Sequence, residues 1–404
     1  MKIGILKETK IPVDNRVALT PTQIKELMEK YPHISFKVQP SDIRAYHDDE
    51  YRDAGITLDD DISDCNVLLG IKEATPDSLL PNKHYIFFGH IAKKQSYNKP
   101  LFRALLKKKV TFSDYEYLVN PNGERLVAFG WYAGIVGVYY TLAAWGKRTQ
   151  LYSLPKPTLN FSTEDMISNL RQHLVGKAKI AITGAGRVSK GAQYILDRIG
   201  INRIPHQEFL AIADPDRFVY CVLPKDILVK PNDKPEASSL CFKNHPEAFH
   251  SDFKRYQSET DILISCHYWE NNQPKYITTD EMKSTDFRIK LIGDITCDIK
   301  GSIESTIRSS THNHPFYDFN PLTESEQPPF SSPSNITVMA VDTCPNALPR
   351  ETSKHFGEQL IAHVLKDLFE NPQEPNQTLE RATIVKEGKL TPQFSYLQDY
   401  VQTL

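Results

Sequence analysis

The sequence of 404 residues lacks the features that mark membrane, secreted and nucleic-acid-binding proteins. No run approaches the ~18 apolar residues of a transmembrane helix, and the N-terminus, MKIGILKETK, lacks the cationic flank and apolar core of a signal peptide. Positive charge is not in excess, because 48 Lys and Arg face 50 Asp and Glu. We therefore expect a soluble, cytoplasmic protein with no nucleic-acid or membrane partner.

Cysteine is also scarce and scattered. The six cysteines, at 65, 221, 241, 266, 297 and 344, form no CxxC pair and show no metal-ligand spacing, so we expect buried free thiols. The HNHP segment has His312 and His314 without a neighbouring carboxylate or thiol, which favours a solvated loop. No metal site is predicted.

What the sequence does contain is an alternation of strands and helices, typical of an α/β fold with parallel sheets. In LTPTQIKELMEKY, Thr20 is a predicted N-cap and Gln23 completes a capping box. The length predicts more than one domain, and the Pro-rich LYSLPKPTLNFSTED, after a long apolar helix, indicates a boundary nearby. Residues 319–335, rich in Pro and Ser, are predicted to be a surface loop.

Two short apolar runs end at side chains that can hold or transfer protons. VLLGI is followed by Lys72 and Glu73, and YIFFG by His90; GILKE near the N-terminus ends in a similar Lys-Glu pair. In an open parallel sheet, ligands bind beyond the carboxyl ends of the strands, so these groups are expected at one edge. Without further context, a solvated strand end for Lys72 and a core histidine for His90 are the commoner explanations.

The segment KAKIAITGAGRVSKGAQYILDRIG predicts a strand, a glycine turn and a helix, the first half of a dinucleotide-binding unit. Its glycines, Gly184, Gly186 and Gly191, depart from the GxGxxG spacing, and a tight turn without a ligand is the alternative. About 20 residues further, where an acid binds the NAD ribose, only Glu208 is near, while Arg203 and His206 suit a 2′-phosphate. NAD and NADP both remain open.

Six stretches carry a more specific signal, and they are, in order, KETKIPVDNRVALTP, GIKEATPDSLLPNKHYIFFGHIAKKQ, DYEYLVNPNGERLVAFGWYAG, TGAGRVSKGAQ, GDITCDIKGSIE and VDTCPNALPRETSKHFG. Together they resemble the saccharopine dehydrogenases of the L-lysine-forming type, within the alanine dehydrogenase and transhydrogenase superfamily. The lysine-ketoglutarate reductase half of the bifunctional aminoadipic semialdehyde synthases is the most similar.

The resemblance implies two Rossmann-like domains with an active site in the cleft between them. Residues 1–140 and 346–404 would form the substrate domain, and residues 141–345 the dinucleotide-binding domain. It also implies a reaction in which L-lysine and 2-oxoglutarate condense to an imine that NADH or NADPH reduces to saccharopine, or the reverse. We expect a monomer or a small homo-oligomer.

The resemblance assigns roles residue by residue. His90 matches the acid-base catalyst of the carbinolamine and imine steps, and Lys72 the acceptor of the proton on the secondary amine. Glu73 and Glu116 match acids that tune this pair. The substrate contacts implied are Arg16, Gln95, Arg125, Phe129, Thr296 and Asp298. The cofactor contacts implied are Gly184, Gly186, Arg187, Gly191, Tyr268, Ile295, Val341 and Asp342.

Two other functions compete with this interpretation. One is an amino-acid dehydrogenase similar to alanine dehydrogenase. The other is a catalytically silent nucleotide-binding protein, which has no physical need to keep Lys72, His90, both arginines and Asp342 together. The glycine loop looks more like that of the reductase half, which implies NADPH and the saccharopine-forming direction.

Overall fold

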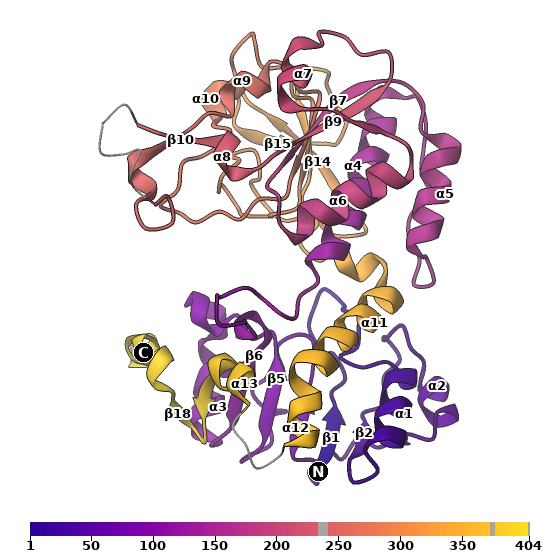
Figure 1. The fold of residues 1–404 in the computed structure, drawn as a ribbon, viewed down its shortest axis with the longest axis vertical. Coiled ribbons are helices and arrows are strands. Elements are labelled where there is room, and N and C mark those ends of the chain that lie inside the picture. The colour runs from indigo at the N-terminus through magenta and orange to yellow at the C-terminus, as the bar shows by residue number, and fades with distance from the viewer. Residues whose placement is uncertain (233–240, 372–375, 403–404) are drawn as a thin grey trace. The chain divides into compact units, whose positions relative to one another are not determined.

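The computed structural model describes residues 1–232, 241–371 and 376–402. The chain folds into two compact units, the first formed by residues 1–129 and 349–404 and the second by residues 130–348 (Figure 1). In the described residues, no helix has both the length and the apolar character to cross a membrane.

The first unit contains an eight-stranded sheet in the order β18-β17-β6-β5-β4-β1-β2-β3. Neighbouring strands from β6 to β3 are parallel, while β17 and β18 add an antiparallel edge. The strands are β1 (Lys2–Ile5), β2 (Ser35–Val38), β3 (Thr57–Leu58), β4 (Val67–Leu69), β5 (His84–Phe87), β6 (Thr111–Asp114), β17 (Thr383–Lys386) and β18 (Lys389–Leu390).

Helices cover this sheet, and the longer ones have recognisable start signals. The predicted cap of α1 is confirmed, since the Thr20 side chain accepts from the Gln23 backbone amide and the Gln23 side chain accepts from the Thr20 backbone amide. The helices are α1 (Pro21–Lys30), α2 (Asp48–Asp53), α3 (Lys99–Lys107), α11 (Pro349–Leu360), α12 (Lys366–Glu370), α13 (Gln377–Ala382) and α14 (Gln398–Gln402). Short 3₁₀ segments are η1 (Ile91–Lys93), η2 (Ser96–Asn98), η3 (Tyr115–Tyr117) and η8 (Pro392–Leu397), and a π-helical segment, η7 (Ile361–Leu365), joins α11 to α12.

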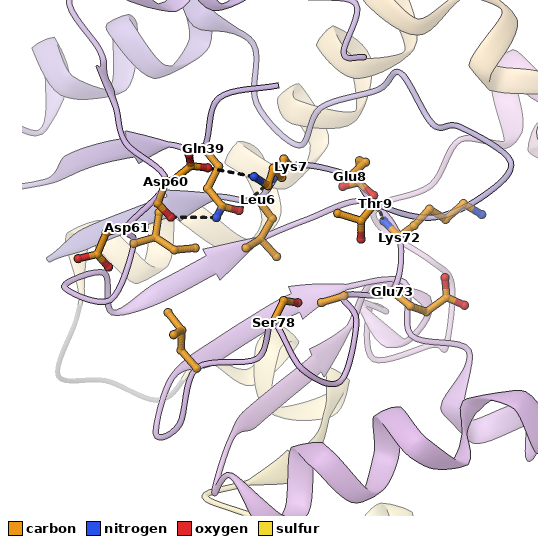
Figure 2. A pocket seen from close by; sticks show the side chains of 13 residues that line it. Leu6, Lys7, Glu8, Thr9, Gln39, Asp60, Asp61, Lys72, Glu73 and Ser78 are labelled. Atoms are coloured by element: carbon orange, nitrogen blue, oxygen red, sulfur yellow. Dashed lines mark hydrogen bonds and ion pairs between the residues drawn. The ribbon is translucent and has the colours of Figure 1, made fainter. Parts of the chain in front are cut away.

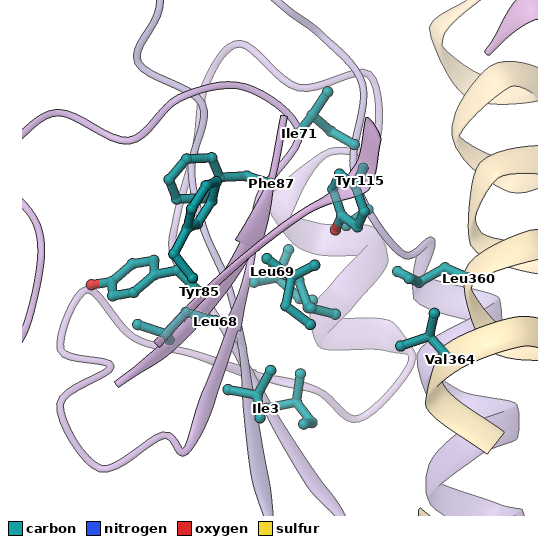
Figure 3. Close-up of a cluster of buried hydrophobic side chains, with 14 of the residues drawn as sticks. Ile3, Leu68, Leu69, Ile71, Tyr85, Phe87, Tyr115, Leu360 and Val364 are labelled. Carbon is teal, nitrogen blue, oxygen red and sulfur yellow. The ribbon is translucent and has the colours of Figure 1, made fainter. Parts of the chain in front are cut away.

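The core of the first unit joins segments from both ends of the chain. Figure 3 shows Leu360 and Val364 of the late helical segment facing the same apolar cluster as Ile3 and Leu69, and all four are fully buried. Burial of apolar surface of this kind stabilises a fold by about 25 cal/mol per Å². The C-terminal helices therefore belong to the first unit.

The second unit has its own eight-stranded sheet, in the order β15-β14-β16-β13-β12-β7-β9-β8. Its strands are β7 (Ala178–Thr183), β8 (Asn202–Arg203), β9 (Phe218–Leu223), β12 (Ile262–Ser265), β13 (Leu291–Asp294), β14 (Phe316–Asn320), β15 (Ser325–Gln327) and β16 (Ile336–Met339), beside a small pair, β10 (Val229–Pro231) and β11 (Phe249–Ser251). Its helices are α4 (Gly130–Thr149), α5 (Thr163–His173), α6 (Arg187–Arg198), α7 (His206–Ala211), α8 (Lys225–Leu228), α9 (Lys254–Gln257) and α10 (Thr279–Met282), with the short turns η5 (Pro246–Ala248) and η6 (Cys344–Ala347).

The long apolar helix α4 lies wholly in the second unit, whereas the sequence-based boundary after residue 140 would have cut through it. Helix α4 belongs to the second unit because it packs closely on α6 through glycines. A Cβ on Gly134 would lie 2.0 Å from the carbonyl oxygen of Val188, and a Cβ on Gly191 would lie 2.0 Å from the carbonyl oxygen of Trp131. Helices α4 and α6 therefore touch backbone to backbone. The Pro-rich stretch after α4 is an internal connection of the second unit.

Two other expectations need correction. Residues 319–335 are not a loop throughout, because Phe316–Asn320 and Ser325–Gln327 pair as an antiparallel hairpin at the sheet edge and Phe319 is buried. Of the cysteines, four are buried as predicted, but Cys241 is exposed and Cys297 is partly exposed.

Candidate active site

The two proton-carrying segments of the first unit lie at neighbouring strand ends. Strands β4 and β5 are parallel, with Leu69 opposite Ile86, and their carboxyl ends lead to Lys72-Glu73 and to His90. The His90 Nδ1 atom lies 2.8 Å from Glu73 Oε1, so the structure brings these two side chains together. Next to them, between β4 and β1, the order of strands along the chain reverses, which is where open α/β sheets bind ligands.

Glu73 is held as an anion. Burial alone would raise its pKa, but the bonds from His90 and from Lys10, whose Nζ lies 2.5 Å from Oε2, lower the pKa to about 2. An ionised carboxylate accepts only, so Nδ1 of His90 carries a hydrogen and Nε2 is the ring atom left to exchange a proton. His90 itself has a left-handed backbone (φ 50°), a conformation that costs energy and is enriched at functional sites.

Lys72 is partly buried beside a second group of charges. Burial lowers its pKa, and the Arg16 guanidinium lowers it further, while Asp14 and Glu73 oppose the shift. In the part of the chain that the structure describes, its Nζ makes no hydrogen bond or ion pair, and Figure 2 shows the side chain extending away from Glu8. This amine is therefore closer to its neutral, proton-accepting form than an exposed lysine.

Arg16 is buried and tied to Asp14. Its Nε and one terminal nitrogen donate to the two carboxylate oxygens at 2.8 and 2.5 Å, and the guanidinium lies over the Phe129 ring, 4.1 Å from the centroid. Phe129 in turn stacks on Phe356 at 4.4 Å. The predicted pair Arg16 and Phe129 thus forms one rigid face.

The remaining predicted residues of this unit, Glu116, Arg125 and Gln95, differ in their exposure. Glu116 Oε1 is 3.2 Å from both Lys93 Nζ and Arg125 Nη2; burial would raise its pKa, but these two cations and His90 lower it. Arg125 retains 47% side-chain exposure. Gln95 is exposed, and its carbonyl accepts from the Tyr400 hydroxyl.

In the second unit, the glycine loop has the geometry of a phosphate cradle. Gly184 has φ 85°, and a Cβ there would meet the backbone of His267 at 2.8 Å. Gly186 caps α6 without any side chain, and a Cβ there would find open space. Helix α6 begins at Arg187, so the positive end of its backbone dipole lies next to this open space, an arrangement that favours an anion. Gly191 instead makes the contact with α4 described above.

The other predicted cofactor and substrate contacts divide by exposure. Tyr268 is 77% exposed, and Asp298 and Asp342 are exposed at the ends of strand segments. Thr296 donates to buried Asp294, both from its amide and from its hydroxyl. Val341 is buried, and the Ile295 side chain packs against Gly137 of α4. A cofactor would therefore contact the backbone of these two residues rather than their side chains.

The strand order changes which strand end we expect to face the cofactor ribose. The strand beside β7 is β9, not β8, and Gly184 donates to the carbonyl of Leu223 at 2.8 Å. Lys225 follows that strand end, with Asp226 next to it, whereas Arg203 lies on the outer strand and bonds Gln193 in the middle of α6. His206 is bonded to Tyr256, and Glu208 is exposed in the same outer segment. The structure thus places the end of β9, which leads to Lys225, beside the glycine loop, and the Lys225 amine lies 3.7 Å from the centroid of the Phe242 ring.

Comparison with known proteins finds homologues of this chain. Residues 4–136 match the family described as alanine dehydrogenase/PNT, N-terminal domain. The alpha-aminoadipic semialdehyde synthase of Arabidopsis thaliana is 31% identical across 98% of this chain and 41% of its own length. The NAD(+), L-lysine-forming saccharopine dehydrogenase of Candida glabrata is 28% identical, with 88% of each chain covered. This chain is a homologue of the saccharopine dehydrogenases.

This chain spans less than half the length of the semialdehyde synthases that it matches. The bovine protein, for example, is 28% identical and is matched over 46% of its length. Among solved structures, an L-alanine dehydrogenase aligns with a TM-score of 0.64 and 16% identity, over 100% of this chain and 99% of that one. A transhydrogenase from Sinorhizobium meliloti aligns at 0.58 and 13%, over 97% and 99%. These likenesses show the fold, two Rossmann-like domains.

The sequence analysis did not predict several charged residues of the first unit of this chain. Glu8 is partly buried and Asp114 fully buried; withdrawal from water raises the pKa values of these carboxyls to about 8 and about 7, with Asp14 and Glu116 adding to the respective shifts. Burial would raise the pKa of Asp14 too, but Arg16 lowers it. The repeated Lys-Glu ending of the first strand was a signal for Glu8. No sequence pattern indicated that Asp114 would be buried.

Proposed function

We propose that this chain is an NADP(H)-dependent oxidoreductase that interconverts saccharopine with L-lysine and 2-oxoglutarate. The observation that carries the proposal is the pairing of His90, oriented by ionised Glu73, with Lys72, whose pKa is lowered by burial, at neighbouring strand ends. The overall likeness to saccharopine dehydrogenases supports the choice of substrate.

The proposed reaction needs two proton carriers. His90 exchanges a proton through Nε2 with the carbinolamine oxygen as water is gained or lost at the imine carbon, while Glu73 stabilises the imidazolium. Lys72 accepts the proton of the saccharopine secondary amine, a role that requires its neutral form. The nicotinamide cofactor supplies or accepts the hydride at the same carbon.

The substrate's three carboxylates require cations with several donors. Arg16 is held rigid by Asp14 and Phe129, and Arg125 is half exposed next to Glu116, so the two suit a buried and a peripheral carboxylate respectively. Gln95, Phe129, Thr296 and Asp298 complete the proposed substrate contacts.

The residues of the second unit fit a dinucleotide. Gly184 and Gly186 allow the pyrophosphate to approach the amides at the start of α6, and Arg187 adds a cation there. Tyr268, Ile295, Val341 and Asp342 are the proposed contacts of the nicotinamide half. Gly191 supports the loop by packing rather than by contact.

Lys225 at the end of β9 favours a 2′-phosphate, and hence NADPH. We expect Lys225→Ala to raise the Michaelis constant for NADPH about tenfold, since one charge-assisted hydrogen bond contributes roughly 1.5 kcal/mol, and to leave that for NADH nearly unchanged. The matched control is Arg203→Ala, on the outer strand. An equal change for both cofactors, or a larger effect at Arg203, would contradict the assignment to Lys225.

A direct assay tests the function itself: purified chain, L-lysine, 2-oxoglutarate and either NADH or NADPH, followed at the nicotinamide absorbance. Oxidation that depends on both substrates, with saccharopine formed, is the expected result. Turnover of pyruvate and ammonia instead would favour an enzyme similar to alanine dehydrogenase, the alternative that the N-terminal domain family raises. Cofactor binding without turnover of either pair would indicate a silent nucleotide-binding protein.

A further inference from the structure

Glu8 continues, with its side chain, the pairing of strands β1 and β4. The backbone ladder between these strands ends where Leu6 donates to the carbonyl of Leu69 at 2.9 Å. Just beyond it, Glu8 Oε1 accepts from the Ile71 amide at 2.6 Å and Oε2 from the Lys72 amide at 2.9 Å. One carboxyl group thus holds the two successive amides that lead into Lys72, and Figure 2 shows the bond to the Lys72 amide.

The Glu8 carboxyl is partly withdrawn from water, which disfavours its ionised form. Burial and the neighbouring Asp14 raise its pKa to about 8, even though the two amides and Arg16 oppose the shift. Its surroundings also include Tyr115, whose hydroxyl is buried and finds no hydrogen-bond partner among the described residues. Each carboxyl oxygen accepts from one amide, an arrangement that favours the ionised form because a proton on either oxygen would compete with one of these bonds. The two amides therefore oppose the upward shift of the Glu8 pKa.

The same device recurs at the second proton carrier. Asp114, at the end of β6, accepts from the Gly89 amide at 3.1 Å through Oδ2 and from the Glu116 amide at 2.9 Å through Oδ1. Gly89 immediately precedes His90. In each case, an acid at or beyond the end of an adjacent strand holds the backbone next to a proton carrier.

We propose that Glu8 is a positioning residue, which orients Lys72 for proton transfer by holding the Ile71 and Lys72 amides. The role rests on the proposed function of Lys72. Glu8 acts through the backbone of its neighbour and need not contact the substrate. Loss of the clamp lets the Lys72 side chain leave its partly buried position beside Arg16, so that its amine regains the protonation of an exposed lysine.

The test compares Glu8→Gln, which keeps size and one acceptor, with Glu29→Gln on the exposed face of α1. With Glu8→Gln we expect kcat to fall about tenfold, the size of a modest loss of acid-base catalysis, with Michaelis constants within about twofold. Hydrogen exchange of the Ile71 and Lys72 amides should accelerate locally. The rate at which an amine reagent labels Lys72 near pH 8, read by mass spectrometry, should fall. Glu29→Gln should change none of these.

Each other result overturns the proposal. An unchanged kcat would do so, and so would a raised Michaelis constant at constant kcat, which indicates direct substrate binding. Loss of activity with faster exchange throughout the first unit would indicate a purely structural role. If Glu8→Gln does not fold, the same measurements are made on Glu8→Asp, whose shorter side chain weakens the bonds to the two amides. If the wild type does not turn over lysine and 2-oxoglutarate, the proposed function fails, but the exchange and labelling measurements still decide whether Glu8 positions Lys72.

Discussion

Replacing His90 with Ala, or Lys72 with Met, is expected to lower kcat by roughly 10²-fold or more in each case. His90 is oriented by a 2.8 Å bond to Glu73, and alanine removes the ring that exchanges the proton. Methionine keeps much of the length of Lys72 but cannot accept a proton. Initial rates with saturating lysine, 2-oxoglutarate and reduced cofactor measure both effects.

The controls are residues of the same type and unit that lie outside the site. His33 is exposed and bonds the carbonyl of Phe369, and Lys25 is exposed on α1, so His33→Ala and Lys25→Met should retain the wild-type kcat. A variant that raises only a Michaelis constant would show that the residue binds substrate rather than moving protons. Turnover equal to the wild type in either site variant would rule out its proposed role.

Local signals in the sequence predicted much of each unit. Thr20 and Gln23 form the predicted capping box, and the glycine turn leads from β7 into α6, because both depend on a few consecutive residues. The edge hairpin β14–β15 and the placement of β9 beside β7 depend on pairing between distant segments. Spacing along the chain pointed to Arg203 for the ribose site, and only the strand order directs attention to Lys225.

For the site as for the fold, the sequence predicted the features that depend on local position but not those that depend on packing. The rule that ligands gather beyond parallel strand ends located Lys72, Glu73 and His90 correctly at neighbouring ends. It could not indicate that Arg16 pairs with Asp14, or that Asp114 is buried, because both follow from how several elements pack. Burial of an acid is a property of the tertiary structure, and no sequence pattern encodes it directly.

Gly191→Ala is expected to destabilise the second unit by about 2–4 kcal/mol, in the upper range for overpacking. A Cβ at this position would lie 2.0 Å from the Trp131 carbonyl oxygen and 2.9 Å from its carbon, and backbone atoms of a packed helix cannot move aside as a flexible side chain does. Helices α4 and α6 would have to separate, which would also disturb the neighbouring contact of Gly134. Urea unfolding measures the loss.

The chain provides both a selective probe and a matched variant for this measurement. All three tryptophans, Trp131, Trp145 and Trp269, lie in the second unit, so their fluorescence reports the unfolding of that unit. Gly186→Ala adds the same methyl group in open space at φ −79°, and should keep the urea midpoint while weakening NADPH binding, because the pyrophosphate would approach there. Stability lost at Gly186, or kept at Gly191, would reverse the two roles and make Gly191 the glycine that the cofactor requires.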